Sequence, residues 1–368
     1  MTFYDTIANI NWEQTSKEIY SKTVSDVEYA LGKHHLDIED LKALVSPAAE
    51  NYLEAMAKIS QEETQKRFGK TIQFYIPLYL SNECINHCIY CGFNHNNKIH
   101  RTILTDEEII KEVNIIKNMG FEHILLLTGE SPARAGVDYI EHAIQLVKPY
   151  FKQISLESQP LSQQEYQQLQ QSGLYGVYVY QETYNKYRYT YYHPAGTKKD
   201  YKYRLETPER LGKAGIHKIG LGALLGLEDW RIESVFLGLH LRYLEKYYWK
   251  SKYSVSFPRI RPHAGEFQPN FDVNDKQFAQ MIFALRIFDH DIEMSLTTRE
   301  DSLFRNNMFS LGITSMSAGS KTEPGGYSQK DELEQFAVND NRSPKEMVEM
   351  ITDNGYEVVW KDWDNFND

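Results

Sequence analysis

The three cysteines of this 368-residue chain all lie in one short stretch, at Cys84, Cys88 and Cys91. Cysteines used as small apolar residues are expected to be scattered, and cysteines used for disulfides come in even numbers. Three thiolates in one loop therefore indicate a metal or cluster site. Because the chain has no fourth cysteine, one position of a four-ligand site is left for another ligand.

Two kinds of site fit this set of ligands. A 4Fe-4S cluster held by three cysteines leaves one iron free to bind a small molecule. A zinc ion would need a fourth protein ligand, for which His87, His95 and His100 are candidates. The three-cysteine set favours the reactive cluster over the zinc site.

Polar residues also follow the predicted strands, at the end where a parallel barrel carries its active site. The backbone of Thr128 and Gly129, together with the carboxylate of Glu130, could receive an ammonium group. Glu157 follows the next predicted strand and could accept hydrogen bonds from ribose hydroxyls. For Glu130, a simple role at a helix start is an equally good interpretation.

Later strand ends add further candidates. Gln181 and Glu182 are long polar side chains at a buried strand end, and we expect one or both to face the site. Arg299 could bind a carboxylate through two parallel hydrogen bonds, as an amino-acid substrate would require. Its alternative role is a salt bridge to Glu293 or Glu300.

Short β-rich runs alternate with amphipathic helical stretches from residue 71 onward, which predicts consecutive βα units and a parallel sheet. Strands are expected at 73–80, 123–127, 153–156, 176–180, 218–223, 254–257, 291–296 and 312–316. Helices are expected at 105–119, 137–147, 162–171, 230–248 and 275–288. The fold class is therefore α/β, a (β/α)8 TIM-type barrel, with a six-stranded partial barrel as the alternative.

We expect a helical N-terminal segment over residues 1–70, the barrel over 71–320, and a C-terminal extension over 321–368 that closes the barrel. The tyrosine-rich stretch 184–203 is expected to decorate a long connection. The formal charge is −11, without a block of Lys or Arg, which argues against nucleic acid or an anionic membrane as a partner.

The N-terminus lacks the basic and apolar regions of a signal peptide, and no apolar run approaches the ~18 residues of a membrane span. We therefore expect a cytoplasmic protein. A reducing cytosol also suits thiolates that must stay free to hold a cluster.

The Cys-x-x-x-Cys-x-x-Cys spacing, with Tyr90 directly before the last cysteine, resembles the signature of radical S-adenosylmethionine (SAM) enzymes. In that superfamily the open iron binds the amino and carboxylate groups of SAM, and one electron splits the sulfonium to give a 5'-deoxyadenosyl radical. Residues 128–130 resemble the Gly-Gly-Glu element that holds the methionyl amine, with Thr128 replacing the first glycine. The resemblance implies SAM contacts by Tyr90, Thr128, Gly129, Glu130, Glu157 and Gln181.

From about residue 70 to the end, the chain resembles the 2-iminoacetate synthases, the radical SAM tyrosine lyases of thiamine biosynthesis. The matching motifs are Leu80-Ser81-Asn82-x-Cys84, Tyr90-Cys91-Gly92-Phe93, Leu127-Thr128-Gly129-Glu130, Tyr180-Gln181-Glu182-Thr183-Tyr184, Ser256-Phe257-Pro258-Arg259-Ile260-Arg261-Pro262, Thr298-Arg299-Glu300, Met316-Ser317-Ala318-Gly319-Ser320 and Trp360-Lys361-Asp362-Trp363-Asp364.

This resemblance implies that the adenosyl radical takes a hydrogen from the amino group of L-tyrosine and that the Cα–Cβ bond then breaks. The implied products are 2-iminoacetate (dehydroglycine), p-cresol, 5'-deoxyadenosine and methionine. Implied partners are thiazole synthase, which receives the 2-iminoacetate, and an electron donor of the flavodoxin or ferredoxin type. Arg299 is implied to bind the substrate carboxylate, with Ser317 as a second contact.

Three alternatives stay open at this point. The tyrosine lyase of hydrogenase maturation carries further cysteines for a second cluster, whereas no cysteine follows Cys91 here. A tryptophan lyase is also compatible, because the motif spacing does not reveal which ring the pocket accepts. From a different class, a zinc-stapled, non-catalytic binding module would use His95 to complete the metal site.

Overall fold

The structure is a computed structural model that describes residues 2–263, 267–328 and 333–362. Its centre is a closed barrel of eight parallel strands, in which β1 pairs with both β2 and β8. The strands are β1 Thr71–Ser81, β2 His123–Thr128, β3 Gln153–Glu157, β4 Gly176–Tyr178, β5 Lys218–Gly222, β6 Lys252–Ser256, β7 Glu293–Leu296 and β8 Ser315–Ser317. The predicted eight-stranded barrel is therefore confirmed, and the six-stranded alternative is wrong.

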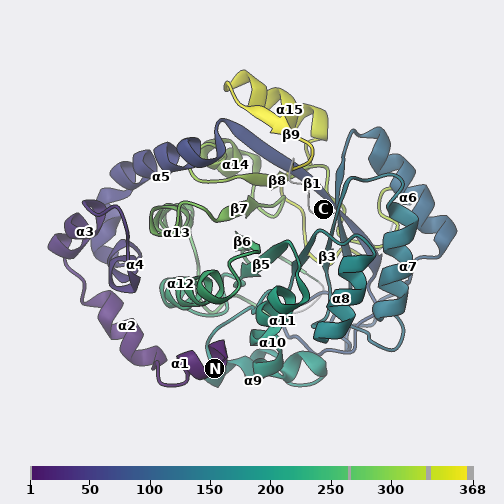
Figure 1. The fold of residues 1–368 in the computed structure, drawn as a ribbon, viewed down its shortest axis with the longest axis horizontal. Helices are drawn as coiled ribbons and strands as arrows, with labels where there is room; N and C mark the ends of the chain where they lie inside the picture. The colour runs from purple at the N-terminus through teal and green to yellow at the C-terminus, as the bar shows by residue number, and fades with distance from the viewer. Residues whose placement is uncertain (1, 264–266, 329–332, 363–368) are drawn as a thin grey trace.

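Helices surround the barrel and connect its strands (Figure 1). They are α6 Asp106–Asn118, α7 Val137–Val147, α8 Gln163–Gln171, α9 Lys186–Tyr192, α10 Tyr201–Leu205, α11 Thr207–Ala214, α12 Trp230–Tyr247, α13 Asp275–Phe288 and α14 Ser302–Met308, with a 3-10 turn η2 at Thr197–Lys199. The crossover from β4 to β5 is the most elaborate, because it contains α9, η2, α10 and α11.

Local sequence signals explain where these elements begin and end. The side chain of Thr105 accepts a hydrogen bond from the backbone of Glu108, whose carboxylate accepts one from the backbone of Thr105. This capping box starts α6. After α6, Gly120 takes a φ of 96°, which only glycine adopts readily and which turns the chain toward β2.

The core lies between the barrel and the helices. Residues on the outer side of the strands, such as Ile124, Leu126, Leu156 and Val177, are fully buried against the helical layer. The lower interior of the barrel is instead polar, lined by Gln73, His123, Lys218, Ser254, Ser295 and Ser315 together with aromatic rings. Buried polar groups need partners, so this interior contains its own hydrogen bonds and an ion pair.

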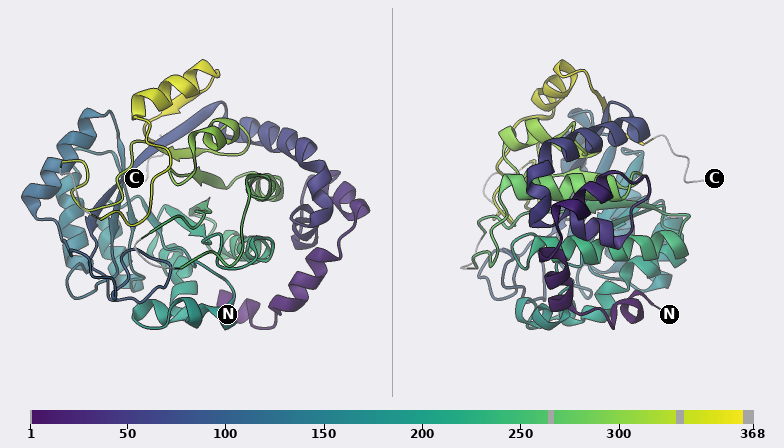
Figure 2. Two further views of the ribbon diagram at one scale, coloured as in Figure 1. Left: turned by 180° about the vertical axis from the view of Figure 1, so that it is seen from behind. Right: turned by 90° about the vertical axis from the view of Figure 1, so that its left-hand side faces the viewer.

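The N-terminal residues form α1 Phe3–Ile7, α2 Trp12–Tyr20, α3 Val24–Leu31, α4 Ile38–Leu44, the 3-10 turn η1 Pro47–Tyr52, and α5 Leu53–Phe68. Helices α2 to α5 form an arc outside α12 and α13, against which α2, α4 and α5 pack (Figures 1 and 2). This segment is thus a second helical layer on one side of the barrel.

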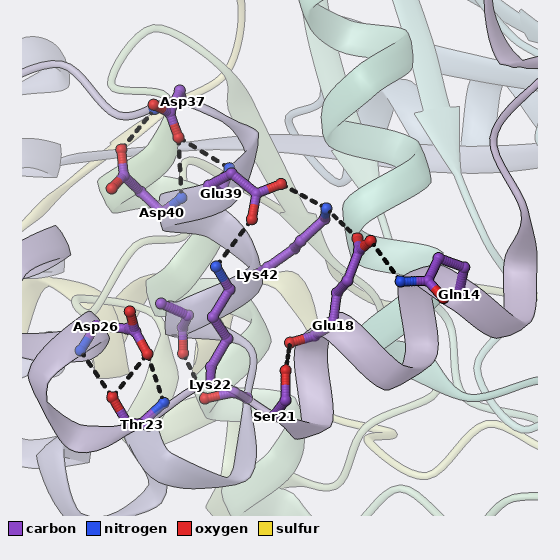
Figure 3. A network of polar contacts seen from close by, with 12 residues as sticks. Gln14, Glu18, Ser21, Lys22, Thr23, Asp26, Asp37, Glu39, Asp40 and Lys42 are labelled. Carbon is purple, nitrogen blue, oxygen red and sulfur yellow. Dashed lines mark hydrogen bonds and ion pairs between the residues drawn. The ribbon is translucent and has the colours of Figure 1, made fainter.

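Charged side chains connect α2, α3 and α4 (Figure 3). The ammonium group of Lys42 donates to Glu18 on α2 and to Glu39 on its own helix, both at 2.6 Å. Lys22, between α2 and α3, donates to the same Glu39 at 2.8 Å. The network adds polar contacts to three short helices that also contribute apolar residues to the common core, among them Ile19, Val27 and Leu41.

The C-terminal residues contribute α15 Pro344–Asp353 and β9 Glu357–Val359. Strand β9 pairs in parallel with the first residues of β1, Thr71–Gln73, outside the closed barrel. In the parts of the chain that the structure describes, no helix is both long enough and apolar enough to span a membrane.

We predict that Glu293→Ala lowers the free energy of unfolding by about 3–5 kcal/mol, because it leaves the ammonium group of Lys218 buried without its partner. The two side chains form an ion pair inside the barrel, and Lys218 is only 1% exposed. Thermal or urea unfolding measures the loss. The double variant Lys218→Met/Glu293→Leu is the control and should be clearly more stable than the single variant; equal stability of the two would contradict this account.

Candidate active site

A cavity opens at the carboxyl ends of the barrel strands and brings together residues from all parts of the barrel. Its lining includes nearly all of the predicted site residues: Cys84, Cys88, Tyr90, Cys91, Thr128, Gly129, Glu130, Glu157, Arg299 and Ser317. The carboxyl ends of parallel strands meet at one face, so residues more than 200 positions apart become neighbours.

The cysteine loop leaves β1 at the rim of this cavity and is held by a buried scaffold. The guanidinium group of Arg101 donates to the carbonyl oxygens of Asn82, Phe93 and Asn94 at 2.7–2.9 Å. The side chain of Asn82 in turn binds the backbone of Thr102 at 2.7 Å. These contacts close the loop at its base, so the three thiols lie on a fixed turn.

All three thiols are free of disulfides, and Cys88 is buried. Burial raises the pKa of Cys84 to about 11 and also raises the pKa of Cys88 and of Cys91. Without a positively charged group bound at the loop, the thiols stay protonated. A bound cation centre would favour the thiolates, which are the metal-binding form.

The histidines proposed as zinc ligands lie outside the cavity lining. His87, His95 and His100 are absent from the cavity lining, and Nδ1 of His95 lies 3.2 Å from the carbonyl oxygen of Cys84. Among the residues described, no three His, Cys, Asp or Glu side chains converge where a single metal ion could sit. His95 lies beside the cysteine loop, with its ring nitrogen Nδ1 at a backbone oxygen of that loop.

Two glycines allow other segments to approach this loop closely. A Cβ atom on Gly129 would lie 2.3 Å from the carbonyl oxygen of Glu83, which precedes the first cysteine. A Cβ atom on Gly92 would lie 2.5 Å from the carbonyl oxygen of Gln335 in the C-terminal region. Both contacts are impossible for any other residue without movement of the backbone.

Glu130 is the centre of a buried polar network. One carboxylate oxygen accepts a hydrogen bond from Arg204 and the other accepts one from Asn86, both at 2.8 Å. Burial raises the pKa of Glu130, but Arg204 and Lys198 outweigh burial and hold it below its ordinary value. Glu130 is therefore an ionised, fixed acceptor, and its remaining lone pairs are available to a ligand.

At the end of strand four, one of the two candidate residues lines the cavity. Glu182 lies in the lining, where it pairs with Lys198 at 2.7 Å. Tyr180 also lines the cavity, whereas Gln181 between them does not. Gln181 is buried with both amide atoms unpartnered among the described residues. Glu182 has a φ of 68°, a strained conformation that clusters at functional sites.

The hydroxyl group of Tyr90 is fixed by a histidine. A hydrogen bond of 2.7 Å joins this hydroxyl to Nε2 of His193, and Nδ1 of His193 lies 2.9 Å from the carbonyl oxygen of Tyr189. Burial, with the nearby Lys198, lowers the pKa of His193 well below its ordinary value. The imidazole is therefore neutral, donates through Nδ1 and accepts from Tyr90 through Nε2.

Glu157 carries a carboxyl group poised between two protonation states. Burial, reinforced by the negative charge of Glu182, raises the pKa of Glu157 to about 7. It lines the cavity one strand away from Glu130. A ligand that donates hydrogen bonds to this carboxylate would favour the ionised form.

Arg299 faces the cavity without an acidic partner among the described residues. Its guanidinium carbon lies 3.3 Å from the ring centre of Phe336. The acids proposed as its partners are engaged elsewhere, Glu293 with Lys218 and Glu300 with Arg259 and Arg261. Burial lowers the pKa of Arg299, and an anion bound beside the guanidinium group would raise it again by pairing with the charge.

Ser317, at the end of β8, lies beside Arg299 in the cavity lining. Its hydroxyl oxygen accepts a hydrogen bond of 3.2 Å from the backbone nitrogen of Thr298. The same hydroxyl group also lies within hydrogen-bonding reach of Tyr75, another residue of the cavity lining.

Sequence reasoning missed several lining residues: Asn86, Lys198, Arg204 and Gln335. The amide of Gln335 donates toward Sγ of Cys91 at 3.7 Å and accepts a hydrogen bond of 2.8 Å from the hydroxyl of Tyr79. Lys198 and Arg204 come from the β4–β5 crossover. Its unusual length was the available signal, since long connections of this kind are often functional.

Known families match both parts of the chain. The Radical SAM superfamily model matches residues 78–237, and the Biotin and Thiamin Synthesis associated domain matches residues 256–357. With a complete barrel and three cysteines at its carboxyl end, the molecule is a radical SAM protein.

The whole-chain relatives are more specific. The 2-iminoacetate synthases of Escherichia coli (strain K12) and Salmonella typhimurium (strain LT2) are each 47% identical over 99% of this chain and 97% of their own length. The chain belongs to the 2-iminoacetate synthase family. A crystal structure of HydG, a maturase of the FeFe-hydrogenase, is 31% identical with a TM-score of 0.91, covering 97% of this chain and 81% of that chain.

The cavity fits the two groups that this class of protein uses. Three free cysteines on one loop are the donor set of a 4Fe-4S cluster with an open iron. Beside them lie unpartnered buried hydroxyl oxygens, Oγ1 of Thr128 and Oγ of Ser320, with the carboxylates of Glu130 and Glu157. These acceptors and donors suit the ammonium and hydroxyl groups of SAM.

We predict that Gly129→Ala impairs cluster incorporation without unfolding the protein, since the new methyl group would displace Glu83 and the cysteine loop. Iron and sulfide per chain, measured after anaerobic reconstitution, should fall several-fold while the unfolding temperature changes little. Gly32→Ala is the matched control, because its added Cβ would meet only ordinary contacts at 3.6 Å. Full cluster content in Gly129→Ala would show that the close approach is unimportant.

Proposed function

We propose that the residues of this cavity perform the 2-iminoacetate synthase reaction by holding the cluster, SAM and L-tyrosine in adjoining regions. As a radical SAM lyase, the enzyme cleaves the Cα–Cβ bond of tyrosine to give 2-iminoacetate and p-cresol. When bound, the cluster and SAM supply one electron and the 5'-deoxyadenosyl radical that starts this cleavage. The observation that carries the proposal is that the three cysteines, the Glu130 network and the unpaired Arg299 line one cavity.

In this proposal Cys84, Cys88 and Cys91 hold the cluster. Glu130 accepts the ammonium group of SAM, since its carboxylate is ionised and held in place by Arg204 and Asn86. The backbone at 128–129 and the free hydroxyl of Thr128 lie at the same strand end and add hydrogen-bonding groups.

Glu157 accepts hydrogen bonds from the ribose hydroxyls of SAM, and Tyr90 packs at the cluster side of the cavity. Glu182 takes the place that the sequence assigned to Gln181, because only Glu182 reaches the cavity. The ammonium group of Lys198 pairs with the carboxylate of Glu182, so the negative charge of Glu182 does not repel the carboxylates of the ligands.

Arg299 binds the carboxylate of tyrosine and Ser317 donates a second hydrogen bond to the substrate. Arginine is suited to this role because its planar fork matches a carboxylate. Phe336 lies against the guanidinium group and holds it toward the cavity. The amino group of the substrate is then positioned on the side of the cavity that faces SAM.

The protein partners belong to the proposal as well. A thiazole synthase would receive the 2-iminoacetate, which is too reactive an imine to be stored in water. A one-electron donor of the flavodoxin or ferredoxin type would reduce the cluster. A cytoplasmic location, with its reducing conditions, would keep the three thiols free.

Anaerobically reconstituted protein should contain about four iron and four sulfide per chain. Replacing Cys84, Cys88 and Cys91 together by serine should abolish this content and leave the barrel folded by circular dichroism. Incubation of the intact enzyme with SAM, a reductant and tyrosine should yield p-cresol. One tightly held zinc and no iron would contradict the proposal.

Arg299→Ala should raise the KM for tyrosine by roughly 30-fold or more, the effect expected when one partner of a buried charge pair is removed. The KM for SAM should change far less, because SAM is proposed to bind other residues. Arg299→Lys keeps the charge but loses the paired hydrogen bonds. Its KM for tyrosine should therefore lie between that of the unmodified enzyme and that of Arg299→Ala. If tyrosine and SAM were affected equally, Arg299 would not be the carboxylate site.

A further inference from the structure

The tyrosine-rich crossover between β4 and β5 lies directly over the cysteine loop. The backbone nitrogen of Ile89 donates to the carbonyl oxygen of Tyr192 at 3.2 Å, and that of His87 donates to Ala195 at 3.1 Å. At Gly196 the two segments are so close that a Cβ atom would lie 2.2 Å from Oδ1 of Asn86. One side of the crossover therefore contacts the loop that carries the cluster ligands.

The crossover is also the most basic stretch of an acidic protein. Residues 186–204 contain six Lys or Arg and a single acid, Asp200, in a chain of net charge −11. Two of the six, Lys198 and Arg204, are buried and serve the cavity through Glu182 and Glu130. The charge of the remaining four stays at the surface.

These four cations are Lys186, Arg188, Lys199 and Lys202, and all are exposed. Arg188 contacts Glu228 at 3.4 Å and Lys202 contacts Glu206 at 3.8 Å. Lys186 and Lys199 form no ion pair with any described residue. Exposed carboxylates near this surface are Asp200, which follows Lys199, and Asp5, which interacts with Lys202, so its unpaired positive charge is that of Lys186 and Lys199 among the described residues.

Exposed aromatic rings lie among the cations. Tyr187, Tyr191 and Tyr203 are 72%, 53% and 41% exposed, and the guanidinium group of Arg188 lies 4.5 Å from the ring centre of Tyr191. Tyrosine and arginine are the residues that most often dominate binding energy at protein interfaces. Helices α9 and α10 lie at the periphery of the molecule, where a partner can reach them (Figure 1).

We propose that the surface formed by α9, η2 and α10, here called the α9–α10 surface, binds an acidic one-electron carrier protein. The carrier gives up one electron and the cluster held by Cys84, Cys88 and Cys91 takes it up. This inference rests on the proposed function, which needs an electron from outside the chain. The exposed cations favour an acidic partner, and the backbone hydrogen bonds to the cysteine loop connect this surface with the segment that holds the cluster ligands.

The test uses the reconstituted holoenzyme and the variant Lys186→Glu/Lys199→Glu, which reverses the two unpaired charges. Cluster reduction is followed by rapid mixing and electron paramagnetic resonance, with reduced flavodoxin as the acidic carrier and photoreduced deazaflavin as a small reductant. At low ionic strength the variant should be reduced by flavodoxin at least ~10-fold more slowly. Reduction by deazaflavin should be unchanged.

Added salt should slow the reaction of the unmodified enzyme with flavodoxin and affect the variant much less, because salt screens the attraction between exposed charges. The control Lys58→Glu/Lys250→Glu makes the same change of charge on exposed lysines of α5 and of the amino end of the barrel. It should react with flavodoxin nearly as fast as the unmodified enzyme.

Equal slowing in both double variants, or full speed in Lys186→Glu/Lys199→Glu, would overturn the docking site. Such a result leaves the proposed function standing, since p-cresol formation with the small reductant measures the lyase alone. Absence of p-cresol with either reductant, with a fully loaded cluster, would instead contradict the proposed function.

Discussion

The buried carboxylate of Glu130 is the interaction on which the site depends. Burying a charge is costly unless it is paired and hydrogen-bonded, and Glu130 obtains its partners from two distant segments, Asn86 in the cysteine loop and Arg204 in α10. The same charge compensation therefore joins the end of β2, the cluster ligands and the β4–β5 crossover. Removing Arg204 would take away the cation that pairs with this carboxylate, and removing Asn86 would leave one of its oxygens without that donor, so the three segments depend on one another. The ion pair and hydrogen bonds that keep Glu130 ionised for a ligand also fix the segments that line the cavity.

Much of this could be predicted from the sequence, because the patterns involved are local. Each barrel strand is a short apolar run followed by a polar end, and three cysteines in one loop leave few interpretations. What the sequence left open depended on tertiary context. The choice between Gln181 and Glu182 is decided by which side of the chain faces inward after β4 ends at Tyr178. Lys198 and Arg204 resemble ordinary surface cations in sequence, and only the fold shows that they are buried against Glu182 and Glu130.

The comparison with HydG shows how far one barrel can serve different proteins. Its structure superimposes with a TM-score of 0.91, although this chain covers only 81% of it. This structural similarity concerns the shared fold. The chemistry of each protein is set by the residues at its strand ends and by segments outside the barrel. The superposition covers 97% of this chain, so most of the outer helical layer of α2 to α5 belongs to the shared scaffold as well.

The segment that carries Gln335 and Phe336 closes part of the cavity that the barrel alone would leave open. Gln335 reaches Cys91 from 244 positions away in the sequence, and its neighbour Phe336 covers Arg299. Backbone hydrogen bonds from Gln335 to Thr322 and from Ala337 to Pro262 hold the segment at the end of a long loop, so its opening would not require the barrel to unfold. Each brief opening would uncover a cluster ligand to the solvent while the barrel stays intact. The lifetime of the active enzyme in air would then be set by this short segment, and not by the stability of the fold.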